Sequence, residues 1–146
     1  MYRHVLVAID GSPFSLKAAE HGLGLAKAIG AKATAIYVTP TWRALALSEI
    51  AVGHVEQQFD AQMKQTAERY FAQLRDVASQ LGMTCESVHV VGDTPYESII
   101  KTAADRGCDV VVVGSHGRRG MTSLLLGSET TKLLTHSKIP VIVYRA

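Results

Sequence analysis

The sequence has few of the residues that define specialised classes of protein. Its 146 residues include two cysteines, too few for a disulfide framework, and Cys85 and Cys108 lack the CxxC spacing of a metal or redox motif. Both adjoin apolar runs, so we expect buried free thiols, with a redox pair as the alternative. No run approaches the ~20 apolar residues that a membrane helix needs. The sequence indicates an ordinary globular chain without a membrane span.

The sequence also lacks a large excess of either sign of charge. The chain carries 15 Lys and Arg against 13 Asp and Glu, a net charge of +2, and its basic residues are scattered apart from the pair Arg118 and Arg119. Nucleic acid is therefore not an expected partner. The apolar run begins shortly after Met1, without a charged leader or a cleavage site, so a cytoplasmic location is expected.

Established catalytic motifs are missing as well. The sequence has no GxxxxGK[ST] loop, no GxSxG elbow, and neither the His-x-Gly-His nor the Ser-Gly-Gly-x-Asp-Ser signature of adenylyl-transfer enzymes. Neither cysteine comes with an identifiable partner base. The sequence therefore predicts no catalytic residue.

Apolar runs alternate with helical patterns along the whole chain. The runs that read as strands span residues 4–9, 33–38, 84–91, 110–113 and 140–144. Strands that alternate with helices predict right-handed βαβ units and a mostly parallel, doubly wound α/β sheet with helices on both faces. The length fits one domain, residues 1–146, in which residues 42–53 are not assigned.

Two of the expected helices have recognisable starting sequences. Ser12 followed by Pro13 is typical of an N-cap and a first helical residue, and residues 94–97, TPYE, read as a capping box. A Gly22-x-Gly24 pair lies within the first of these helices. It lacks a third glycine and a strand-to-helix turn, so we do not read it as a dinucleotide motif.

A glycine-rich loop follows the valine run at 110–113. Gly114 ends that run, Gly117 follows after two residues, and Gly127-Ser128 follows after nine more. Glycines let the backbone approach a ligand closely. Ser128 suits the N-cap of the next helix, whose free amides would form an anion site, and Arg118 adds charge. The stretch therefore predicts a phosphate-binding cradle, with a flexible loop that holds no ligand as the alternative.

This spacing resembles the nucleotide-binding signature of the universal stress protein family, and the resemblance covers the chain from HVLVAIDGS to IPVIVYR. It implies a Rossmann-like five-stranded sheet of order 3-2-1-4-5. Ligands of such sheets bind where the strand order reverses. That point lies between the strands ending at Ile9 and Val113, where the loops at residues 10–12 and 114–117 would meet.

The resemblance also implies ATP as the ligand and assigns its binding residues, which are Asp10, Val38, Val113, Gly114, His116, Gly117, Arg118, Gly127, Ser128, Glu129 and Thr130. Asp10 would lie near the ribose, or else serve the electrostatics of the next helix. The backbone of Val38 would meet the adenine. The hydroxyl of Thr130 would reach a phosphate, and His116 would face either the ligand or solvent.

Glu129 departs from the family pattern, which often has a small or apolar residue there. Its carboxylate would either repel the phosphates or help to hold a divalent cation. The resemblance implies Mg²⁺ or Mn²⁺ held mainly by the phosphates of ATP and by water, since the sequence shows no cluster with metal-ligand spacing.

The favoured function is an ATP-binding stress-response protein that acts as a nucleotide-dependent switch or sensor with at most slow hydrolysis. The alternatives are an enzyme that hydrolyses ATP or transfers its phosphate, and an interaction protein that binds no nucleotide. The last strand, residues 140–144, is expected at a sheet edge, where it would pair with a second copy in an antiparallel homodimer. The sequence does not indicate which regulatory partner would read the bound state.

Overall fold

The structure, a computed structural model, describes residues 1–45, 53–116 and 125–145. Its strands are β1 (His4–Ile9), β2 (Lys32–Thr39), β3 (Glu86–Val91), β4 (Val110–Gly114) and β5 (Val141–Tyr144). Its helices are α1 (Pro13–Ile29), α2 (Trp42–Leu45), α3 (Gly53–Gln80), α4 (Pro95–Arg106) and α5 (Ser128–His136). No helix in this described part is both long and apolar enough to cross a membrane.

The strands form one five-stranded sheet of order β3-β2-β1-β4-β5, in which every neighbouring pair is parallel. The predicted sheet and strand order are confirmed. In the central strand, Val5 pairs with Ala33 of β2 on one side and with Val110 of β4 on the other. The order reverses beside β1, and β5 lies at the edge of the sheet, as expected.

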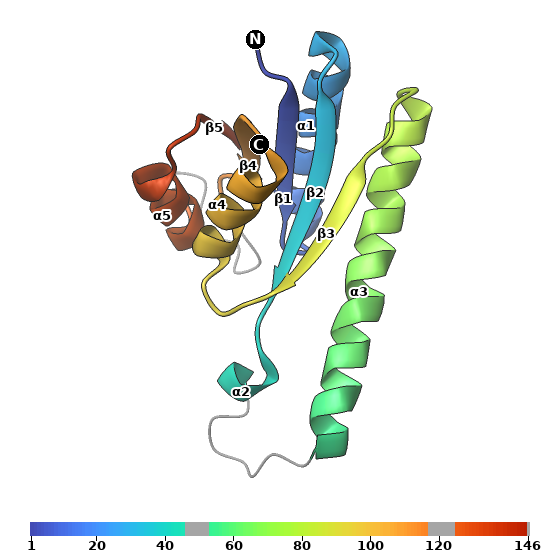
Figure 1. The fold of residues 1–146 in the computed structure, drawn as a ribbon, viewed down its shortest axis with the longest axis vertical. Coiled ribbons are helices and arrows are strands. Elements are labelled where there is room, and N and C mark those ends of the chain that lie inside the picture. Colours follow the sequence, from blue (N-terminus) through green and yellow to red (C-terminus); the bar gives the residue numbers. More distant parts are fainter. Residues whose placement is uncertain (46–52, 117–124, 146) are drawn as a thin grey trace.

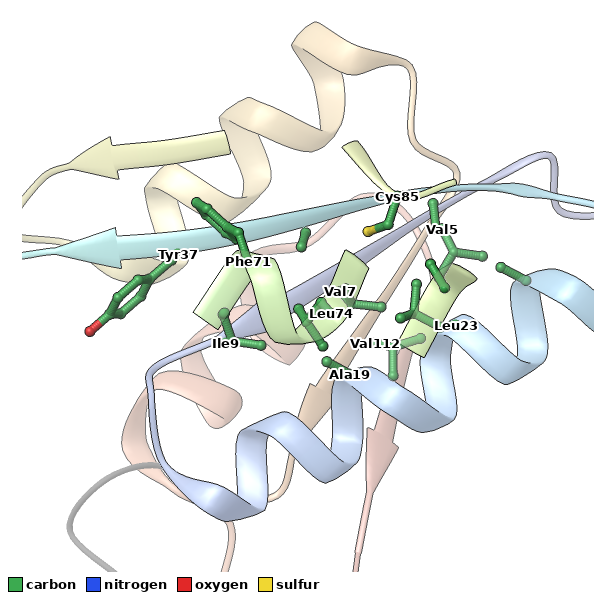
Figure 2. Packing of buried hydrophobic residues seen from close by; sticks show 14 of the residues in the cluster. Val5, Val7, Ile9, Ala19, Leu23, Tyr37, Phe71, Leu74, Cys85 and Val112 are labelled. Carbon is green, nitrogen blue, oxygen red and sulfur yellow. The ribbon is translucent and has the colours of Figure 1, made fainter. Parts of the chain in front are cut away.

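Helices cover both faces of the sheet (Figure 1). On one face, α1 and α3 pack on side chains such as Val5 and Val7 of β1 (Figure 2). On the other, α4 and α5 pack on a second cluster that includes Leu6 and Val111. Successive residues of a strand point to opposite faces, so the apolar runs of β1 and β4 supply both clusters.

Helix α1 begins and ends as its sequence predicts. The hydroxyl of Ser12 accepts a hydrogen bond from the backbone N–H of Ser15 at 3.1 Å, and Pro13 is the first helical residue. Gly30 ends the helix in the left-handed conformation, with φ of 71°. Within the helix, a Cβ at Gly22 would overlap with Cγ1 of Val7, so this glycine lets α1 approach the sheet closely.

Helix α4 begins at Pro95 after Thr94, as predicted, but its predicted capping bond and the predicted cap of α5 are wrong. Thr94 precedes α4, but its side chain makes no capping hydrogen bond. The N–H of Tyr96 is bound instead by the carboxylate of Glu129 in α5, at 3.1 Å. The N-cap of α5 is Gly127, and Ser128 is the first helical residue. The capping hydrogen bond of α4 thus comes from a distant segment, which local sequence patterns do not report.

The two cysteines are free and buried, as predicted. Cys85 belongs to the cluster under α1 and α3, whereas Cys108 belongs to the cluster on the opposite face. The sheet therefore separates the two sulfur atoms, which argues against the redox pair.

Candidate functional site

A cavity of about 620 Å³ opens at the carboxyl ends of β1, β2 and β4. At these strand ends the strand order reverses, because the central strand β1 has β2 on one side and β4 on the other. In open parallel sheets the connecting loops separate at such a point and leave room for a ligand. The cavity therefore lies where the sequence predicts it.

Nine of the eleven predicted binding residues line this cavity, namely Asp10, Val38, Val113, Gly114, His116, Gly127, Ser128, Glu129 and Thr130. They come from three strand ends, the loop after β4 and the first turn of α5. The other two, Gly117 and Arg118, lie outside the described residues.

The first turn of α5 is fixed to the end of β4. The N–H of Gly127 donates to the carbonyl oxygen of Ser115 at 2.7 Å, and the hydroxyl of Thr130 donates to the carbonyl oxygen of Gly114 at 2.9 Å. The first intrahelical bond runs from Thr131 N–H to Gly127 oxygen at 3.0 Å. The amides of residues 128–130 precede that bond, so they remain available to an anion at the cavity wall.

These bonds change the role expected of Thr130. Its hydroxyl has a single proton, and that proton is used by the carbonyl oxygen of Gly114. Thr130 is also buried, with 7% of its surface exposed. The side chain therefore ties α5 to β4, and the backbone N–H is the donor of Thr130 that stays available at the cavity.

Gly114 is required for packing, a role that the sequence reading missed. A Cβ at this position would lie 2.8 Å from the ring of Phe14 in α1. The imidazole of His116 stacks on the same ring, with the centroids 4.1 Å apart and the planes at 16°. The missing side chain of Gly114 thus makes room for Phe14, and Phe14 holds the ring of His116 at the cavity.

Asp10 serves the turn between β1 and α1 while it lines the cavity. One of its carboxylate oxygens accepts a hydrogen bond from the backbone N–H of Ser12 at 2.9 Å. Its own N–H donates to the hydroxyl of Ser15 at 3.2 Å. Asp10 therefore holds the turn before α1, and it remains at the position proposed for a ribose contact.

Glu129 has two partners in the structure. One carboxylate oxygen accepts the hydrogen bond from Tyr96 N–H, and the other lies 3.5 Å from Nζ of Lys132. The side chain is 43% exposed. Glu129 is therefore neither buried nor unpaired, but its charge remains at the cavity.

The apolar wall of the cavity was not predicted from the motif. Its members come from strand ends, from α4, from α5 and from the loop before α5, and include Ile36, Pro95, Ile99, Leu126 and Leu133. The alternation of β2 could have indicated Ile36, which lies two residues before Val38 and so faces the same side. Ile99 could not be found in this way, because only the packing of α4 over β2 brings it to the site.

Comparisons with known proteins agree with this architecture. The sequence model described as "Universal stress protein family" matches residues 1–145. Universal stress protein YxiE of Bacillus subtilis is 28% identical over 149 aligned positions, which cover 99% of this chain and 100% of that protein.

Solved structures extend the likeness to three dimensions. The structure of MJ0577, a universal stress protein of Methanocaldococcus jannaschii, superposes with a TM-score of 0.81 at 25% identity, over 100% of this chain and 97% of that one. A universal stress protein described as a complex with cAMP gives a TM-score of 0.69 at 25% identity, over 99% of this chain and 97% of that one. With the family match spanning nearly the whole sequence, the chain belongs to the universal stress protein family.

Proposed function

We propose that this protein binds an adenine nucleotide, ATP in the first place, and acts as a nucleotide-dependent switch or sensor in a stress response. The observation that carries the proposal is the cavity itself, which joins an apolar wall to the first-turn amides of α5. The related structure in complex with cAMP supports an adenine nucleotide as the ligand class.

Different parts of the cavity lining suit the adenine and the phosphates of a nucleotide. Val38 and Ile99 offer an apolar surface to an adenine ring. The amides of residues 128–130 lie at the positive end of α5, which favours a phosphate. Asp10, at the end of β1, is then placed to accept hydrogen bonds from ribose hydroxyls.

A divalent cation would enter with the nucleotide. No group of three or more His, Cys, Asp or Glu side chains gathers into a metal site among the residues that the structure describes. The cavity offers the carboxylates of Asp10 and Glu129, which are too few to replace the water shell of Mg²⁺. The phosphate oxygens of the nucleotide and water would therefore supply most of the ligands of the cation.

We also propose that β5 pairs with the β5 of a second copy. It is a short edge strand, and its Ile142 is 37% exposed. An open edge of this kind presents unpaired backbone groups to another strand. Light scattering at micromolar concentration should report a dimer, and a monomeric mass would refute the pairing.

The binding proposal is tested by calorimetric titration with ATP and AMP, using a variant that removes one backbone donor. Ser128→Pro deletes the first amide of α5 at the helix position that tolerates proline best. Gly127, with φ −61° and ψ 155°, already has the conformation that a residue before proline prefers. Ser128→Ala keeps the amide and serves as the matched control.

We expect Ser128→Pro to weaken nucleotide binding by about tenfold, the value of one charge-assisted hydrogen bond, with little change in melting temperature. Ser128→Ala should bind like the parent. Absence of both binding and a thermal shift for the parent protein would favour the interaction protein that binds no nucleotide. A turnover of ATP above ~1 per second would favour the enzyme.

A further inference from the structure

The described residues that line the cavity carry more negative than positive charge. Among the described residues that line it, the ionisable side chains are Asp10, His116 and Glu129. Two of the three are carboxylates, and this described lining contains no Lys or Arg. At these described residues, a ligand with several phosphate charges meets a carboxylate at the end of β1 and another at the start of α5.

Glu129 is the carboxylate nearest to the expected phosphates. It follows Ser128 in the first turn of α5, whose amides form the proposed anion site. Its hydrogen bond from Tyr96 N–H holds the side chain between α4 and α5, where it still lines the cavity. The charge is thus fixed in place by the fold.

The neighbouring lysine does not cancel that charge. Lys132 Nζ lies 3.5 Å from Glu129, but the two side chains are 51% and 43% exposed. Ion pairs this exposed are weak, because water screens the attraction and ordering the long lysine side chain costs entropy. Glu129 also takes up part of the positive potential that the start of α5 would otherwise offer to a ligand.

We propose that Glu129 is a specificity-determining residue that makes the cavity discriminate between ligands by phosphate charge. A nucleoside monophosphate, or a polyphosphate neutralised by a divalent cation, is accepted, and a metal-free polyphosphate is disfavoured. This inference rests on the proposed function and deepens it. It differs from a general need for metal, because it assigns the discrimination to one side chain of this chain.

The test compares three ligands by calorimetric titration: AMP, ATP with EDTA, and ATP with excess Mg²⁺. The test variant is Glu129→Gln, whose amide oxygen can still accept the hydrogen bond from Tyr96 N–H. The matched control is Glu97→Gln. Glu97 also lies in the first turn of a helix and is exposed, and it does not line the cavity.

We expect Glu129→Gln to raise the affinity for metal-free ATP by about tenfold and the affinity for AMP by less than about threefold. The difference arises because the repulsion grows with the number of phosphate charges. The advantage of Mg²⁺-ATP over free ATP should shrink by a similar factor. Glu97→Gln should change neither ratio. The gain for free ATP should decline in 0.5 M salt, as expected for a charge effect at a partly exposed site.

Two results would overturn the inference. If the affinities for AMP and for free ATP change by the same factor in Glu129→Gln, Glu129 acts on binding in general and does not sense phosphate charge. If all three ligands bind but no affinity changes, its charge has no influence on the site. If no adenine nucleotide binds to the parent or to either variant, the proposed function itself fails. Melting curves of each variant separate these results from a loss of folding.

Discussion

The carboxylate of Glu129 in α5 accepts a hydrogen bond from the backbone N–H of Tyr96 in α4, at 3.1 Å. Helices leave their first N–H groups without intrahelical partners, and a side chain usually caps them from the preceding residue. Here the preceding residue, Thr94, makes no such bond, and the cap comes from another helix. One side chain thus links the start of α4 to the start of α5, beside the cavity.

Removing this cap should destabilise the protein. Glu129→Ala leaves the N–H of Tyr96 without its protein partner, and we expect a loss of about 1 kcal/mol in the free energy of unfolding, since loss of a helix cap typically costs that much. Glu129→Gln, which keeps an acceptor, should lose less. Urea denaturation of the three proteins measures the difference. Equal stability of Glu129→Ala and the parent would show that the bond contributes nothing.

Two glycines of α1 should respond in opposite directions to the same substitution. A Cβ at Gly22 would overlap with Cγ1 of Val7, whereas a Cβ at Gly24 would meet no atom within 4 Å. We expect Gly22→Ala to lose about 1–3 kcal/mol of stability through overpacking. Gly24→Ala should gain about 0.5–1 kcal/mol, because alanine favours the helix. Stability changes of the same sign would contradict the packing described for this face of the helix.

The pattern of apolar residues was sufficient to predict the sheet and most of its helices. The alternation of strand-like and helix-like patterns in the sequence predicted the order of the elements, and Ser12 predicted the beginning of α1. The strand order came from the family resemblance, which added information that periodicity does not contain. The boundary at Gly127 was missed because a glycine tied to Ser115 replaced the expected serine cap.

The sequence predicted the glycine-rich and acidic parts of the candidate site together with Val38 and Val113, but not the rest of the apolar wall. Residues of the glycine motif and Asp10 stand out in the sequence because loops at strand ends carry distinctive residues. Ile99 does not stand out, because any amphipathic helix contains such residues and only tertiary packing brings one to a cavity. The stacking of His116 on Phe14 was likewise hidden, since the two residues come from loops and helices far apart in the chain.

The two thiols should react slowly in the folded protein. Burial raises the pKa of Cys85 and that of Cys108 from 9.0 to about 11. At pH 8 the reactive thiolate should be about a hundredfold scarcer than in an unfolded chain. Alkylation followed by mass spectrometry, with and without denaturant, measures this. Rapid labelling of either thiol in the native protein would contradict the burial described here.

The same pKa shifts predict how stability depends on alkaline pH. The folded chain keeps thiol protons that the unfolded chain releases above its pKa of 9.0. This contribution to stability is therefore fully present below pH 9 and is lost as the pH rises toward 11.

Asp109 should contribute to stability at neutral pH and not in acid. Burial acts to raise the pKa of this carboxyl group, but hydrogen bonds from the backbone N–H groups of His4 and Arg3 outweigh it and lower the pKa below 3.8. Those bonds measure 2.9–3.1 Å. A lowered pKa stabilises the fold above pH 3.8, and the gain is lost as the pH falls below it.

We therefore expect Asp109→Asn to lose about 1 kcal/mol at pH 7, a value at the low end for bonds to a charged group because the site is largely solvated. At pH 3 or below, the difference in free energy of unfolding between the variant and the parent should become smaller. Urea denaturation at both pH values provides the comparison. A gap that stays constant or widens in acid would refute this account of Asp109.

The most direct test of the central claim is a crystal structure of the protein with Mg²⁺ and ATP at saturating concentration. We expect the adenine to lie against Val38 and Ile99, and phosphate oxygens to lie within hydrogen-bonding distance of the amides of residues 128–130. A nucleotide bound elsewhere on the protein, or a cavity that stays empty at saturation, would contradict the assignment of this site.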